Sequence, residues 1–203
     1  MTRRVVLQCL LLPGLLTLAP AQSNAQGPSQ DTQIAAALLA APGAQRAEAS
    51  VLGFNSAGKL VTLRKGSNEL VCLGDDPTDE RFSVACYHAS LEPYMARGRE
   101  LAASGITDGN ERLQIRWKEA EEGTLAMPEN PATLYVLTGT SFDPAAGTVE
   151  DSYLRFVVYM PWATVESTGL TDAPMGPGTP WLMYPGTPGA HVMISPPKAA
   201  EGG

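Results

Sequence analysis

Three cysteines constrain this chain more than any other feature of its sequence. Cys9 lies in an apolar stretch, residues 5–18, that follows a basic N-terminus and is too short and too interrupted to span a bilayer. This pattern is typical of a signal peptide. Small residues suited to cleavage occur both at Ala19 and Ala21 and at Ser23 and Ala25; we favour cleavage after Ala25 and expect residues 1–25, with Cys9, to be removed.

Removal of the signal peptide would leave two cysteines, Cys72 and Cys86. An exported chain is periplasmic or extracellular, and disulfides persist in such oxidising compartments. We therefore expect the two cysteines to be bonded. A bonded pair cannot ligate zinc, and only His88 and His191 then remain among the preferred ligands. We expect neither a metal nor a cofactor.

Charge narrows the range of partners. Removing residues 1–25 takes Arg3 and Arg4 from the 14 Lys and Arg but none of the 21 Asp and Glu, so the net charge moves from −7 to −9. Nucleic-acid binding needs a clustered basic surface, which is lacking here. No second apolar stretch reaches the roughly 20 residues of a membrane helix. The expected partner is a small ligand or an envelope protein.

The mature length, about 175 residues, suits one domain. Residues 26–48 read as a flexible lead-in followed by a short helix, and residues 49–197 as a single α+β domain. Residues 198–203 are expected to form a disordered tail. The fold class predicted is a mainly antiparallel β-sheet with two or three helices packed on one side.

Short apolar runs separated by turn residues predict the strands of that sheet. We expect an antiparallel meander at the start of the domain, two central strands later, and an edge strand in a tail rich in proline and glycine that packs back over the sheet. These segments are residues 50–54, 59–64, 69–73 and 81–88, then 134–137 and 153–160, and finally 190–195.

Two segments inside the domain, after the first short helix, have helical features. Ser90 as cap, Gly105 as stop and apolar residues at spacings of three and four predict a helix between them. Residues 110–122 fit two structures: Leu113, Ile115 and Trp117 alternate as in a strand, whereas a cap at Asn110 favours a helix. We interpret this segment as a helix.

Two local patterns resemble a group of uncharacterised exported bacterial proteins. The first is Leu63-Arg-Lys-Gly-Ser-Asn68 followed by Cys72, and the second is Pro185-Gly-Thr-Pro-Gly-Ala-His191-Val-Met. The resemblance implies a secreted single-domain protein with a disulfide, and it implies no activity. Arg64 and Lys65 in the first pattern are compatible with an anion site or with plain hairpin chemistry, and we favour the hairpin.

The two histidines are the best candidates for chemistry, because histidine is the usual base near neutral pH. His88 falls at a strand-to-helix junction, where backbone capping is the alternative role. His191 falls near Trp181 and Tyr184, and such aromatic residues around one titratable group are typical of a small-ligand pocket.

Motifs for a serine nucleophile, a phosphate loop, dinucleotide binding or a zinc protease are not present in the sequence. The acidic stretch at residues 74–80 is compatible with loose calcium binding or with a solvated loop, and we favour the solvated loop. We therefore expect a non-enzymatic binding or accessory module, with His88, His191, Trp181 and Tyr184 as candidate ligand contacts. The alternative is a hydrolase-type enzyme that uses His88 or His191 with a nearby carboxylate.

Overall fold

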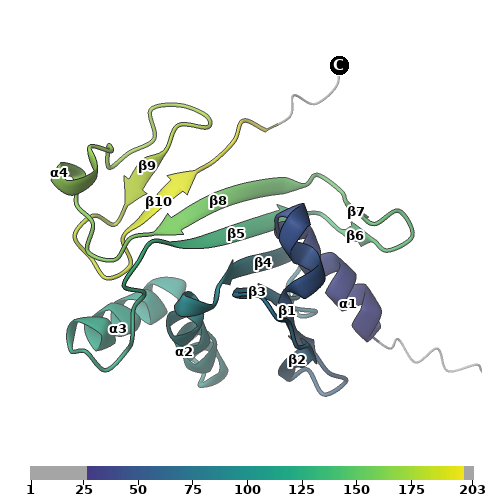
Figure 1. The fold of residues 1–203 in the computed structure, drawn as a ribbon. Coiled ribbons are helices and arrows are strands. Elements are labelled where there is room, and N and C mark those ends of the chain that lie inside the picture. Colours follow the sequence, from purple (N-terminus) through teal and green to yellow (C-terminus); the bar gives the residue numbers. More distant parts are fainter. Residues whose placement is uncertain (1–26, 199–203) are drawn as a thin grey trace, which may run out of the picture.

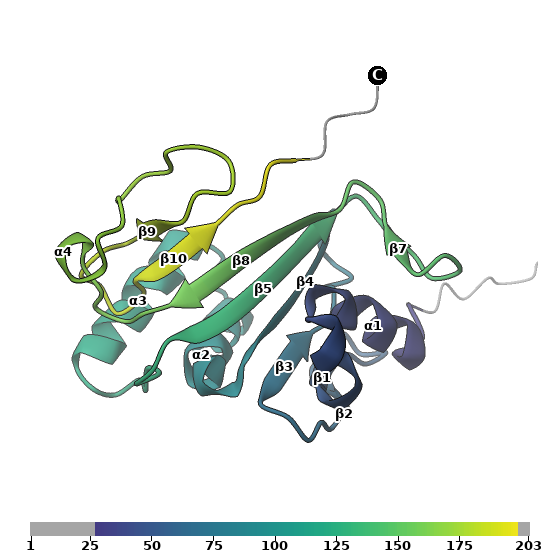
Figure 2. The ribbon, with the colours of Figure 1, turned by 45° about the horizontal axis from the view of Figure 1, so that its top comes forward.

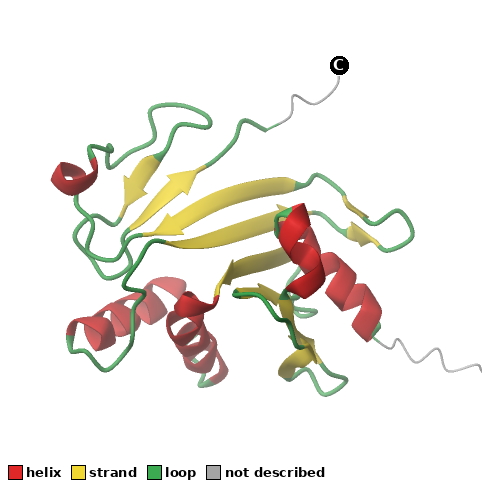
Figure 3. Cartoon of the chain, in the orientation of Figure 1, coloured by secondary structure: helices red, strands yellow, loops and turns green. Residues whose placement is uncertain are grey.

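A computed structural model describes residues 27–198. The signal peptide expected at 1–25 and the tail after Lys198 lie outside these residues. The α+β class is confirmed: strands form one large, mostly antiparallel sheet, and helices lie against it (Figure 1, Figure 3). No helix within residues 27–198 is long and apolar enough to cross a membrane.

The described elements are more numerous than expected. The helices are α1 (Gln30–Ala37), α2 (Glu92–Ala103), α3 (Gly109–Glu121) and α4 (Val165–Thr168), with short 3-10 turns at Leu38–Ala40, Gly43–Glu48 and Ala89–Leu91. The strands are β1 (Ser50–Phe54), β2 (Leu60–Arg64), β3 (Leu70–Leu73), β4 (Phe82–His88), β5 (Ala132–Gly139), β6 (Phe142–Asp143), β7 (Thr148–Val149), β8 (Tyr153–Tyr159), β9 (Trp181–Met183) and β10 (His191–Ile194).

The sheet order is β2-β1-β3-β4-β5-β8-β10-β9, with β6 and β7 as a separate hairpin. The expected meander is wrong in one respect: β3 does not follow β2 in space but lies on the other side of β1, parallel to it. The strand segments themselves match the sequence pattern. Their order was missed because periodicity defines strands but not their neighbours.

The chain between β2 and β3 explains this order. It turns back across the start of β1, where Ser67 N–H donates to Glu48 O and Gly66 N–H donates to Ser50 Oγ. A Cβ on Gly66 would overlap the backbone of residues 48–50, so only glycine permits the approach. The Arg64 guanidinium donates to Ala49 O and Arg46 O. We call residues 64–68 with these partners the crossover clasp.

Helices cover both faces of the sheet, which corrects the expected packing on one side. The face that carries Val84 and Cys86 packs against α1, and we call it the α1 face. The opposite face, which carries Tyr87 and Leu134, packs against residues from the start of α2 and is the α2–α3 face. In Figure 2, α1 lies in front of the strands while α2 and α3 lie behind them.

The first helix belongs to the core rather than to a lead-in. Ser29 caps α1 by accepting from Thr32 N–H. The face that α1 and the next turn present to the sheet consists of small side chains, which let the helix backbone approach the strands. These are the buried residues Ala36, Ala37, Ala40 and Ala41.

The segment with two possible structures is a helix, α3, as predicted. Its cap is Asp108 rather than Asn110, because the Asp108 carboxylate accepts from the N–H groups of both Asn110 and Glu111. These bonds hold the pKa of Asp108 below its usual value. Arg97 of α2 makes paired hydrogen bonds to the Glu119 carboxylate, which ties the two helices together.

The tail packs back on the sheet as predicted, but it contributes two strands. β10 pairs with β8 on one side and with β9 on the other, so the edge strand is β9 rather than β10. Leu182 of β9 is completely buried. The proline and glycine content therefore marks turns within an ordered segment.

Cys72 of β3 and Cys86 of β4 stand directly opposite each other and form a disulfide. Replacing both by alanine should lower the free energy of unfolding by about 3 kcal/mol, because the bond closes a loop of 14 residues. Urea unfolding measures this loss. A reducing agent is the internal control, since it should destabilise the wild type and leave the double variant unchanged; equal stability of both proteins would contradict the role of the bond.

Truncation after Gly178 removes β9 and β10 and exposes β8 as an edge. We expect a large fall in melting temperature, because buried side chains such as Leu182 are each worth roughly 1.5 to 3 kcal/mol. Truncation after Pro197 is the matched control and should change little. The point variant Leu182→Ala should cost about 2 to 5 kcal/mol, and an unchanged melting temperature after the long truncation would show that the tail does not stabilise the domain.

Candidate functional site

The two histidines do not come together. His88 is on the α1 face of β4 and His191 is on the α2–α3 face of β10, and β5 and β8 lie between these strands. Three strand spacings place them roughly 14 Å apart in the sheet, on opposite sides of it. Within residues 27–198, neither histidine side chain bonds a carboxylate.

His88 is exposed and has a local structural contact. Its Nδ1 accepts from Ser90 N–H at 3.2 Å and lies 2.8 Å from Ser90 Oγ. This imidazole caps the 3-10 turn that leads into α2. The capping role left open by the sequence is therefore the one the structure displays.

His191 is buried, with 8% of its surface exposed, in a cluster of aromatic rings. Its ring centroid lies 5.0 Å from that of Tyr159 and 5.7 Å from that of Tyr184. Tyr184 contacts Trp117 of α3, whose Nε1–H donates to the hydroxyl of Tyr94 on α2. We call these five residues the aromatic cluster; they join α2 and α3 to the tail.

The cluster favours an uncharged imidazole. The Nδ1–H of His191 donates to Gly189 O at 2.7 Å. Burial lowers the pKa of His191, because desolvation penalises the charged form, and the bond to Gly189 opposes this only in part. Burial also raises the pKa of the Tyr94 and Tyr159 hydroxyls.

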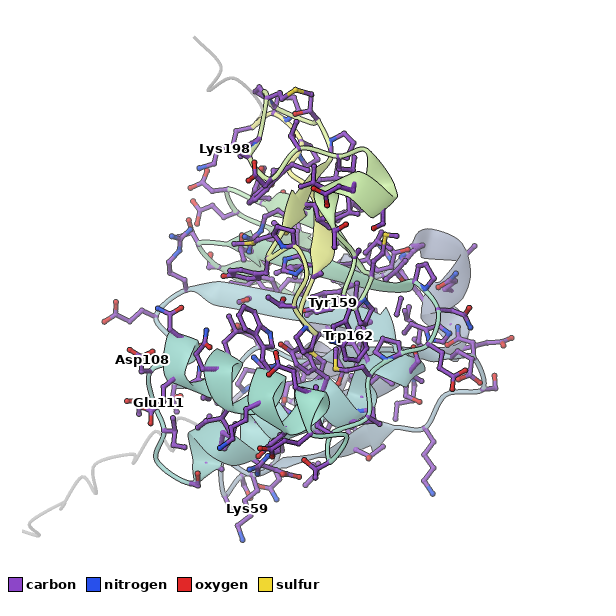
Figure 4. The ribbon with its side chains drawn as sticks, turned by 90° about the vertical axis from the view of Figure 1, so that its left-hand side faces the viewer. Lys59, Asp108, Glu111, Tyr159, Trp162 and Lys198 are labelled. Atoms are coloured by element: carbon purple, nitrogen blue, oxygen red, sulfur yellow. A yellow bond between two sulfur atoms is a disulfide. The ribbon has the colours of Figure 1, made fainter. Side chains whose placement is uncertain are left out.

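The aromatic cluster is closely packed. A Cβ on Gly189 would overlap the Trp117 ring, so this glycine lets the ring lie against the backbone of the tail. Tyr184 has a φ of 56°, a left-handed conformation that is costly for an aromatic residue. Its contacts with Trp117 and His191 hold it there. Figure 4 shows Tyr159 and the neighbouring Trp162 above α3.

Of the sequence-predicted candidates, the structure brings together only His191 and Tyr184. Trp181 lies on β9 opposite Met193, which is two residues after His191 on β10. Its side chain borders a shallow pocket that Tyr153 and Lys198 also line. Sequence reasoning missed Tyr94, Trp117 and Tyr159. The sequence presents Trp117 only as part of a periodic pattern, and no local pattern links helices α2 and α3 to the tail.

A large groove lies elsewhere, at the end of the α1 face. Its volume is about 1180 Å³, and its walls come from four segments that are distant in sequence. These are the start of α1 at residues 27–36, the β1–β2 turn at 54–56, the acidic loop with the start of β4 at 75–82, and the β6–β7 hairpin at 140–144. We call it the α1 groove.

The groove has an aromatic floor and an acidic rim. Phe82 and Phe142 stack with their ring centroids 6.0 Å apart, and Phe54 lines the wall near the β1–β2 turn. Asp75 and Glu80 also line it, whereas no lysine, arginine or histidine does so among the described residues. Sequence reasoning assigned this acidic loop to solvent, because nothing local indicated that Phe142 would face it.

Asp75 is the most constrained acid of the groove. One carboxylate oxygen accepts from Ser83 N–H at 2.8 Å, which fixes the loop against β4. Burial raises the pKa of Asp75; the Ser83 bond opposes this change, and the neighbouring charges of Asp79 and Asp76 add to it. A cation close to Asp75 would favour the charged carboxylate, and so would offset the effects of burial and of the neighbouring negative charges.

No cluster of histidine, cysteine and acidic side chains within the described part of the chain is arranged to hold a metal ion. In comparisons with known proteins, no family model matches this chain, and no curated protein or solved structure is detectably similar to it.

His191 should make stability depend on pH. Its pKa is lower in the folded than in the unfolded protein, so the unfolded state binds the proton more readily and stability falls as the pH drops below about 6.5. Urea unfolding between pH 7.5 and about 5 should show a smaller loss in His191→Gln than in wild type. Identical slopes in the wild type and in His191→Gln would contradict this assignment.

Proposed function

We propose that this protein is a non-enzymatic binding module, exported to the periplasm or secreted, that holds its partner in the α1 groove. The observation that carries the proposal is the groove itself. Four segments distant in sequence converge on it, and it combines an apolar floor with a few polar groups, as ligand sites do.

The positions of the histidines weigh against the hydrolase alternative. A histidine base needs a partner to orient it and a nucleophile or water within reach. His191 is oriented by the Gly189 carbonyl and enclosed by aromatic rings, while His88 bonds Ser90 on the other face of the sheet. Neither residue lines the α1 groove.

The aromatic cluster is a weaker candidate for the binding site, although it contains two of the residues predicted from sequence. Its rings contact one another and the Gly189 backbone, so they fill the space between α3 and the tail. Its contribution is to fasten the tail. A ligand there would have to displace packed side chains.

Export is supported by two independent features. The N-terminal pattern is typical of a signal peptide, and the Cys72–Cys86 disulfide fits an oxidising compartment. The resemblance to uncharacterised exported proteins agrees with this proposal.

The test is a ligand screen read by NMR on isotope-labelled protein, with capped peptides, oligosaccharides and small metabolites as probes. We expect at least one of these three classes of probe to change the NMR chemical shifts of residues that line the groove. Ser56→Trp places a large side chain at the exposed rim of the groove and should weaken that binding at least tenfold, about 1.4 kcal/mol.

Ala126→Trp is the matched control, because Ala126 is exposed and precedes the opposite end of β5, roughly 25 Å from the groove. It should bind as the wild type does. Equal binding by Ser56→Trp and wild type, or signal changes that map only to the aromatic cluster, would overturn the groove as the site.

A further inference from the structure

We infer that the α1 groove binds an extended peptide segment in which lysine or arginine side chains alternate with apolar ones. This inference rests on the proposed function and specifies the partner. Its basis is the combination, in one groove, of an acidic rim, an aromatic floor and hydrogen-bonding groups with free capacity.

The first argument is charge complementarity. The rim carries Asp75 and Glu80, and the same loop contributes Asp76 and Asp79 close by. None of the ion pairs within residues 27–198 involves these four acids. The pairs that do form lie within α2, between α2 and α3, or at the C-terminal end of α3. The loop at residues 75–81 thus carries these four acids against the single cation Arg81, and this excess of negative charge favours cations over anions in the groove.

The second argument is the floor. Phe54 and Phe142 are partly exposed and line the groove together with Asp75 and Glu80. Phe82 stacks on Phe142 and is itself buried in the core of the α1 face, so it supports that ring from below. Burial of a partner's apolar side chain on such a surface is favourable, because it removes apolar area from water. A simple polyamine would use the acids and leave this surface in water.

The third argument is the supply of groups for a peptide backbone. The Thr140 and Ser141 hydroxyls at the rim each bond one carboxylate of the same hairpin, Asp151 and Glu150, so their oxygens keep the capacity to accept from a peptide N–H. The Asn55 side chain uses its oxygen to accept from Ala57 and Lys59 N–H. Its amide nitrogen is then the donor for a peptide carbonyl.

The probes are three capped hexapeptides labelled with a fluorophore, in which leucine alternates with lysine, with serine or with glutamate. Fluorescence anisotropy measures their affinities for the full exported protein. The lysine peptide should bind at least tenfold more tightly than the serine peptide, and the glutamate peptide more weakly than either. High salt should reduce the difference, because the Debye length falls to about 3 Å at 1 M.

Two charge reversals form a matched pair. Glu80→Lys and Asp79→Lys change the net charge equally and lie one residue apart, but only Glu80 lines the groove. For the lysine peptide we expect a loss of about fivefold with Glu80→Lys and of less than twofold with Asp79→Lys, in the range of exposed charge pairs. Both sites are exposed, so the fold should be unaffected, which circular dichroism checks.

The outcomes separate the partner from the proposed function. Equal affinities for the lysine and serine peptides, both blocked by Ser56→Trp, would keep the groove as the binding site and overturn its preference for cations. Spermidine that competes as tightly as the lysine peptide would overturn the peptide in favour of a polyamine. No binding of any peptide, with the ligand screen positive in the groove, would overturn this inference alone.

Discussion

The crossover clasp determines the architecture of this domain. Because Gly66 crosses the backbone of residues 48–50 without a side chain, the chain after β2 passes to the far side of β1, and β3 must pair there in parallel. That position places Cys72 opposite Cys86 and lets β4, β5 and β8 follow as central strands. Any side chain at position 66 would oppose the crossing, and the strand order would lose its support.

The central strands divide the molecule into two faces of different composition. On the α1 face, small alanine side chains and the disulfide give a thin, close-packed layer whose open end is the α1 groove. On the α2–α3 face, large rings join helices to the tail, and His191 stays buried within them. The sheet thus lies between the aromatic residues that fasten the tail and the layer that ends in the α1 groove.

The sequence predicts those features of the structure that depend on residues close together in the chain. The strands at residues 50–88, the helix after Ser90 and the disulfide were predictable, since each follows from local periodicity, a cap or a count of cysteines. The parallel β1–β3 pair, the helices on both faces and the inner position of β10 were not. Each depends on contacts between residues that are distant in sequence, such as Trp117 and Gly189, and no local sequence pattern indicates such contacts.

The same reasoning explains why the distinctive sequence patterns are not the proposed binding site. Arg64 and Gly66 of the first pattern belong to the crossover clasp, and Gly189 and His191 of the second secure the tail against Trp117 and Tyr159. Such positions tolerate few residues because backbone and rings meet there at close range. A groove whose walls come from several exposed segments carries no such restriction on any one residue. Its proposed role depends on the charge and the apolar surface of all its walls together, and only the fold brings these walls to one place.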